Sequence, residues 1–138
     1  MPALDLYHTQ VKNALVKDGW TITNDPLTLQ VGERKLHIDL GAERVIAAKK
    51  ANRKIAVEIK SFLGKSDVEN LERALGQYLL YLRHLAYLEP DRKLYLAVPS
   101  KAFKDLFEEP IGKILLESKD VSVLVFSESG EGILQWIN

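Results

Sequence analysis

The most constraining feature of this sequence is residues 93–98, a run that is almost entirely apolar, with Leu-Tyr-Leu-Ala-Val inside it. A strand with one buried face alternates apolar and polar residues, whereas a continuous apolar run indicates a strand covered on both faces. Such a strand lies in the middle of a sheet, between layers of helices. The run therefore predicts an α/β fold.

The segments around this run predict a mixed sheet flanked by helices, in one domain that spans residues 1–138. Apolar residues at helical spacing predict a helix at 4–18 and a longer one at 66–88. Ser66 and Glu69 form a capping box at the start of the second helix. One or two short helices are expected between 100 and 118, interrupted at Pro110. The expected strands are 20–23, 34–40, 43–49, 54–60, 93–98, 121–126 and, at an edge, 133–137.

Charge and cysteine content exclude several classes of protein. Lys plus Arg and Asp plus Glu both total 19, so DNA binding would depend on a local basic patch, a dimer groove or a partner. The absence of cysteine excludes disulfides, thiolate zinc sites and cysteine nucleophiles. The N-terminal residues lack the features of a signal peptide, and no apolar run approaches ~20 residues. We expect a cytoplasmic protein without a membrane span.

Three charged residues on the predicted strands form a candidate metal-dependent site. Residues 54–60 alternate, so Glu58 and Lys60 point to the same side of their strand. If the hairpin places Asp39 beside them, two carboxylates and an ammonium group meet at one edge of the sheet. The carboxylates of Asp39 and Glu58, with the carbonyl of Ile59, can bind Mg²⁺ or Mn²⁺.

This set of groups suits the hydrolysis of a phosphodiester. A metal polarises the phosphate and lowers the pKa of water, while Lys60 orients that water and offsets the charge on the phosphoryl oxygens. A lysine beside two carboxylates stays protonated, which favours this electrostatic role over that of a general base. The alternative is that Glu58 and Lys60 are part of a solvated strand face.

Polar residues outside these strands supply further candidates. Gln77 and Tyr81 lie four apart on one side of the long helix, either as a solvated face or as a wall of the active-site cleft. In the cleft, Gln77 would bind a water molecule or a nucleotide. His37 shares the strand face of Asp39, and His8 borders the apolar side of the first helix, where packing is the favoured role.

A dense basic cluster lies around the turn expected between the strands 43–49 and 54–60. It is either a solvated hairpin tip or a clamp on the DNA backbone close to the site. Lys65 precedes the cap of the long helix, where it could contact a phosphate. The cluster consists of Lys49, Lys50, Arg53 and Lys54.

The order of these elements resembles that of the PD-(D/E)xK nuclease superfamily. Ile38-Asp39 stands where the superfamily has its Pro-Asp, residues 58–60 match its E-x-K, and Gln77 and Tyr81 match the Q-x-x-x-Y of some branches. Over nearly its whole length the chain resembles the XisH family, the fdxN element excision controlling factors linked to site-specific DNA excision in cyanobacteria. The stretches that carry this second resemblance include 7–20, 38–43, 56–66, 74–78 and 107–112.

The resemblance implies a restriction-endonuclease-like core and a Mg²⁺- or Mn²⁺-dependent DNA endonuclease in which Asp39, Glu58, Lys60 and Gln77 are catalytic. It also implies a small XisI-like partner protein, and a homodimer is a further expectation. Holliday-junction resolvase relatives place a Glu on the first helix, where this chain has His8 and Gln10. The alternative function is therefore a non-catalytic regulatory subunit that binds DNA or a partner.

Overall fold

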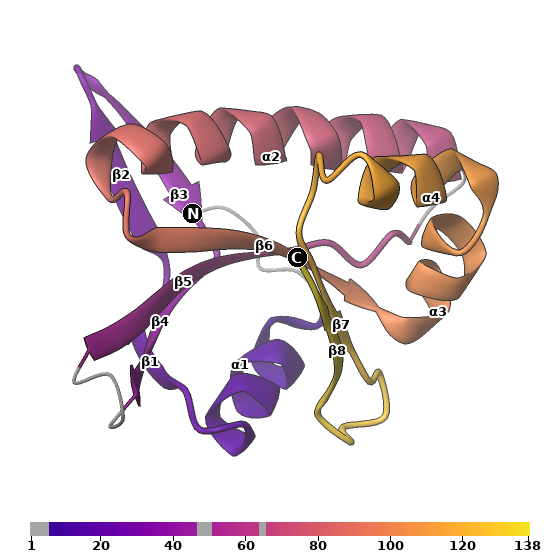
Figure 1. Ribbon diagram of the computed structural model, residues 1–138, viewed down its shortest axis with the longest axis horizontal. Coiled ribbons are helices and arrows are strands. Elements are labelled where there is room, and N and C mark those ends of the chain that lie inside the picture. Colours follow the sequence, from indigo (N-terminus) through magenta and orange to yellow (C-terminus); the bar gives the residue numbers. More distant parts are fainter. Residues whose placement is uncertain (1–5, 47–50, 64–65) are drawn as a thin grey trace.

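The computed structural model describes residues 6–46, 51–63 and 66–138, and it contains a mixed six-stranded sheet between helices (Figure 1). The strand order is β1-β4-β5-β6-β7-β8, and a separate two-stranded sheet consists of β2 and β3. β5, β6 and β7 run parallel, whereas the pairs β1–β4, β4–β5 and β7–β8 are antiparallel. The strands are β1 (Thr21–Asn24), β2 (Leu27–Val31), β3 (Arg34–Ile38), β4 (Leu40–Ile46), β5 (Ala51–Ile59), β6 (Arg92–Pro99), β7 (Val123–Phe126) and β8 (Ile133–Ile137).

Helices cover both faces of the sheet, with α2 on one face and α1 on the other (Figure 1). None of the described helices is long and apolar enough to cross a membrane. Two helical stretches follow β6, the first made of a short α-helix that continues into a π-helix, and the break between the stretches falls before Pro110, as predicted. The helices are α1 (His8–Lys17), α2 (Asp67–Leu88), α3 (Ser100–Ala102), the π-helix η2 (Phe103–Phe107) and α4 (Pro110–Glu117).

β6 confirms the prediction of a central strand. Leu94, Leu96 and Val98 pack in the cluster under α2, while Tyr95 and Ala97 pack in the cluster over α1. Its neighbours β5 and β7 pair with it on either side. Both faces of β6 are thus covered from Leu94 to Val98, and its charged residues, Arg92 and Lys93, lie at the start of the strand.

The chain between residues 27 and 40 differs from the prediction. β2 was not predicted, and it pairs with β3 as a hairpin whose Leu27 and Leu29 pack under α2. The predicted strand 34–40 is instead divided by a bend at Asp39. Ile38 consequently lies in the α2 cluster and Leu40 in the α1 cluster, although simple alternation placed them on one face.

The buried side of α2 is also rotated from the predicted one. Five residues at spacings of three and four face the sheet, and Tyr81 is among them although its side was expected to be either solvated or a cleft wall. Leu79, part of the predicted apolar stripe, is 53% exposed. The buried residues of α2 are Leu71, Ala74, Tyr78, Tyr81 and Leu85.

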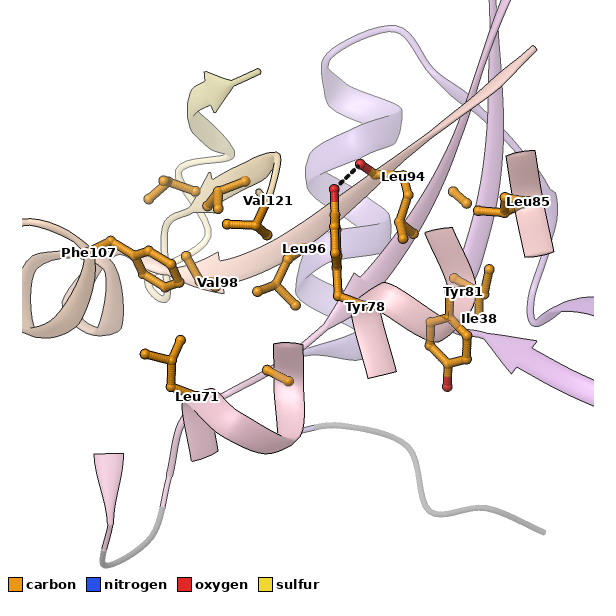
Figure 2. Packing of buried hydrophobic residues seen from close by; sticks show 14 of the residues in the cluster. Ile38, Leu71, Tyr78, Tyr81, Leu85, Leu94, Leu96, Val98, Phe107 and Val121 are labelled. Carbon is orange, nitrogen blue, oxygen red and sulfur yellow. Dashed lines mark hydrogen bonds between the residues drawn. The ribbon is translucent and has the colours of Figure 1, made fainter. Parts of the chain in front are cut away.

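Tyr78 ties α2 to two segments of the sheet (Figure 2). Its hydroxyl donates to the carbonyl of Leu94 at 3.2 Å and accepts from the backbone N–H of Ser122 at 3.0 Å. Burial raises the pKa of Tyr78, although the hydrogen bond from Ser122 opposes that shift. The protonated phenol can therefore donate and accept at the same time.

The substitution Tyr78→Phe should lower the free energy of unfolding by about 1–3 kcal/mol, because it leaves a buried carbonyl and an N–H without their partner. Urea denaturation of the purified chain measures this loss. Tyr87→Phe, which makes the same chemical change at a side chain 87% exposed, should have no effect. Equal stability of the two variants would contradict a structural role for the Tyr78 hydroxyl.

Candidate functional site

The bend at Asp39 and the end of β5 bring two carboxyl groups together. Antiparallel pairing of β4 with β5 places Leu40 opposite Val57, so the preceding Asp39 reaches the level of Glu58. The backbone N–H of Asp39 donates to Glu58 Oε1 at 3.2 Å, and the N–H of Ile59 donates to Asp39 Oδ2 at 2.8 Å. Each carboxylate is thus held by the backbone beside the other.

Burial and the neighbouring charge of Asp39 disfavour the ionised form of Glu58. Glu58 is 5% exposed, and its pKa is raised from 4.5 to about 8, chiefly by burial and then by the charge of Asp39. The charge of Lys60 opposes this rise, with its Nζ 3.7 Å from Glu58 Oε2. A single ammonium group therefore leaves the buried pair short of positive charge.

Lys60 lies immediately beyond the last residue of β5 and is held there by the neighbouring strand. Its backbone N–H donates to the carbonyl of Ala97 in β6 at 3.0 Å. Two residues later, Phe62 has a φ of 56°, in the left-handed region that an aromatic residue seldom occupies. Its ring packs against that of Phe107, with centroids 6.2 Å apart. Backbone strain of this kind occurs where the surrounding structure enforces it, often beside a functional group.

α2 brings Tyr81 to the same corner, and Gln77 lies one turn earlier on the helix. The pKa of Tyr81 is raised to about 12 by burial and by the charges of Glu58 and Asp39, so its phenol stays protonated and able to donate. Gln77 is half-buried, and its Oε1 is enclosed without a hydrogen-bond partner among the described residues. An enclosed acceptor without a partner is costly unless water or a ligand satisfies it.

The donor chemistry of this corner fits Mg²⁺ or Mn²⁺. Such hard cations are held by one or two carboxylates together with water, and a cation would relieve the repulsion that raises the pKa of Glu58. Within residues 6–46, 51–63 and 66–138, no group of three or more His, Asp or Glu side chains could hold a metal ion. A metal would therefore depend on Asp39, Glu58, the carbonyl of Ile59 and water.

The two described members of the predicted DNA-contacting cluster, Arg53 and Lys54, do not lie beside these carboxylates. Lys54 precedes Glu58 by four residues, about 14 Å along the strand. It lies 3.4 Å from Asp91 Oδ2 and 3.9 Å from Glu43 Oε1. Arg53 is on the other face of β5, where its guanidinium group lies over the ring of Trp20 at 6.0 Å. The remaining predicted contacts, Lys49, Lys50 and Lys65, lie outside the described residues.

His8 and Gln10, the first-helix residues that were compared with the Glu of Holliday-junction resolvases, bind other parts of the chain. His8 is buried, and its Nε2 lies 2.7 Å from Asp25 Oδ1, while Gln10 donates to the carbonyl of Glu128. Burial alone would raise the pKa of Asp25, but Lys12 and His8 lower it. The Asp-Pro sequence at Asp25 predicts a turn, but it does not predict the contact of Asp25 with His8.

His37 is exposed on the β2–β3 hairpin, where its Nδ1 lies 3.0 Å from Thr28 Oγ1. The two residues are directly opposite in the antiparallel pairing. This contact leaves the Nε2 side of the ring toward solvent, on the strand that leads into Asp39.

Comparisons with solved structures found two similar proteins. An XisH family protein from Nostoc punctiforme PCC 73102 is 43% identical with a TM-score of 0.85, and the match covers 97% of this chain and all of that one. An fdxN element excision controlling factor protein from Anabaena variabilis is 44% identical with a TM-score of 0.86, over 98% of this chain and all of that one. A search of curated proteins found no match.

A family model also describes the chain. The model of the XisH protein matches residues 1–134, which include both carboxylates, Lys60 and the whole of α2. Since this match and the two structural matches each extend over nearly the full sequence, the chain belongs to the XisH family.

Proposed function

We propose that the chain is a Mg²⁺- or Mn²⁺-dependent DNA endonuclease with a restriction-endonuclease-like, PD-(D/E)xK core. The observation that carries the proposal is a pair of hydrogen bonds, from the N–H of Asp39 to the Glu58 carboxylate and from the N–H of Ile59 to the Asp39 carboxylate. Beside them Lys60 Nζ lies 3.7 Å from Glu58 Oε2. Similarity to the Anabaena variabilis protein, an fdxN element excision controlling factor, supports a role in the excision of DNA elements.

Each protein group at this corner would have its own role in the hydrolysis. A bound Mg²⁺ or Mn²⁺ supplies polarisation of the phosphate and a more acidic water. Asp39 and Glu58 would hold it, and the backbone N–H groups fix the direction of both carboxylates. Lys60 would place a positive charge where negative charge builds on the phosphoryl oxygens. Gln77, whose buried Oε1 needs a partner, would accept a hydrogen bond from water at this corner.

Tyr81 contributes a phenolic hydrogen to the same corner. Its pKa of about 12 keeps it protonated at any pH at which DNA would be cleaved. It can therefore donate to a phosphate oxygen without adding negative charge to a corner that already holds two carboxylates. This is the substrate-binding role that we propose for Tyr81.

A second candidate function is a non-catalytic subunit with the same fold. His8 and Gln10 are engaged with Asp25 and Glu128 and add no acid to the site, and the chain has no net charge to attract DNA. Such a subunit would bind DNA or a small XisI-like partner and would regulate excision without cutting.

Cleavage of duplex, branched and single-stranded DNA by the purified chain, with Mg²⁺ and with Mn²⁺, tests the first candidate. Glu58→Gln, Asp39→Asn and Lys60→Ala should each lower the cleavage rate by about 10²-fold or more, because each removes a ligand or a charge that acts in the transition state. The exposed Glu108→Gln should cleave at the wild-type rate.

An activity that survives Glu58→Gln or Lys60→Ala unchanged would refute this site. A chain that binds DNA or a partner but cleaves none of the three substrates would instead support the regulatory subunit. Circular dichroism of each variant separates a lost site from a lost fold.

The raised pKa of Glu58 predicts a pH dependence of stability in the absence of metal. The folded state retains a proton on Glu58 up to about pH 8, whereas the unfolded chain loses it near 4.5. The folded state thus binds more protons between these values, so the free energy of unfolding should fall as pH rises through this interval, by a few kcal/mol. Above about pH 8 this contribution becomes constant.

Glu58→Gln should remove most of this slope and be more stable than the wild type at the upper end of the interval. Urea denaturation at a series of pH values measures the slope, with Glu117→Gln as an exposed control. Added Mg²⁺ should stabilise the wild type at pH 8 and leave Glu58→Gln unchanged. An identical slope in the two proteins would contradict the assignment.

A further inference from the structure

The side of α2 that faces away from the sheet carries large apolar side chains. Leu79 is 53% exposed, Leu80 46% and Tyr87 87%. At about 100° per residue, these positions surround Gly76 on the side of the helix opposite Tyr78 and Leu85. Figure 1 shows α2 along one border of the molecule, with the sheet on one side of it.

Gly76 is unexplained by the described chain. A glycine within an exposed helix costs about 1 kcal/mol relative to alanine. A Cβ built at Gly76 would meet no atom within 4 Å, and its φ lies outside the left-handed region. Nothing around the helix therefore requires the missing side chain. A second helix that packs closely across this point would require it, since the side chains at the contact set the distance between helix axes.

Two charges of opposite sign lie on this side before and after Gly76, while Arg73, at the edge of this side, is paired with Glu69 at 3.6 Å. Glu72 lies one turn before Gly76, and Arg83 lies one turn after Leu79. Both are exposed, and within the described parts of the chain neither takes part in an ion pair. Glu72 and Arg83 each lie more than one turn from the nearer end of α2. The helix dipole therefore does not account for the negative charge of Glu72 or the positive charge of Arg83.

We propose that this outer α2 face is the interface between two copies of the chain, whose α2 helices pack antiparallel across a two-fold axis. The outer α2 face consists of Glu69, Glu72, Gly76, Leu79, Leu80, Arg83 and Tyr87.

Antiparallel packing makes this face complementary to itself. The axis passes between Gly76 and the Leu79–Leu80 pair, so these leucines of one copy lie over Gly76 of the other. Glu72 of each copy then faces Arg83 of the other, and the contact occurs twice. A different protein could bind this face whatever the order of its charges. A second copy requires that Glu72 of one chain match Arg83 of the other, and the face meets this requirement.

The dimer leaves the candidate site open. Tyr81, which the charges of Asp39 and Glu58 influence, lies on the sheet side of α2 and not on its outer face. The proposal does not depend on catalysis, so a failure of the nuclease assay would leave it intact. An interface made mainly of one helix from each copy is small, and its dimer should dissociate on dilution.

Sedimentation velocity of the full chain over a range of concentrations, at low salt, tests the dimer. Glu72→Arg and Arg83→Glu should each raise the dimer dissociation constant at least about tenfold, because the symmetry creates two like-charge contacts from one substitution. The double variant should recover affinity close to the wild type, since the exchanged charges match again. Lys113→Glu, on α4, is the control for a change of charge alone.

Gly76→Leu separates the interface from the fold. It should abolish the dimer by blocking the close approach, while the monomer keeps or gains thermal stability because leucine favours a helix more than glycine does. Leu134→Ser, at a β8 side chain 52% exposed, should leave the dimer unchanged.

Three outcomes would overturn the proposal. They are a wild type that stays monomeric at every concentration, a dimer that ignores both single charge reversals, and a double variant that remains as weak as the single ones. A monomer that uses this face for another protein belongs to the first of these outcomes.

Discussion

The two hydrogen bonds between the backbone and the carboxylates of Asp39 and Glu58 join the parts of the molecule on which the rest depends. Asp39 is the bend where the chain leaves the β2–β3 hairpin and enters the six-stranded sheet. The bonds fasten this bend to the end of β5. They allow Ile38 to enter the cluster under α2 while Leu40 enters the cluster over α1. The contact that fastens the bend after the β2–β3 hairpin to the end of β5 therefore also assembles the candidate site.

This arrangement is unfavourable for stability in the absence of a ligand. Two carboxyl groups share a buried corner with one ammonium group, and the pKa of Glu58 rises to about 8 as a result. Phe62 holds a left-handed conformation nearby, and Gln77 Oε1 has no partner in the described chain. Three departures from the rules of stable structure thus lie together at this corner, although two further enclosed atoms without a partner in the described chain, His8 Nδ1 and Gln10 Oε1, lie on α1. Such a concentration of violations is typical of functional sites.

Periodicity predicted the elements whose pattern admits one interpretation. The apolar run at 93–98 can only be a covered strand in this context, and the alternation of Ile55, Val57 and Ile59 placed Glu58 on the opposite face, as found. The bend at Asp39 was not predictable in this way, because residues 34–40 alternate without interruption. Only tertiary pairing decides that one half joins β2 and the other half joins β5. The distance of Arg53 and Lys54 from the carboxylates likewise depends on the direction and length of β5. Residue spacing in the sequence does not give either of these.

α2 was misassigned for a different physical reason, which also bears on its outer side. Apolar residues occur around most of this helix, so the pattern allows more than one buried face. The sheet covers the side with Tyr78 and Leu85, and Tyr81 borders the carboxylates. Leu79 and Leu80 remain on the third side, beside a glycine that nothing in the described chain requires. A helix that is apolar on nearly every side is normally covered on nearly every side. The apolar residues that made the buried face of α2 ambiguous in the sequence are more than the sheet alone covers. An additional helix packed on the outer side would account for the rest.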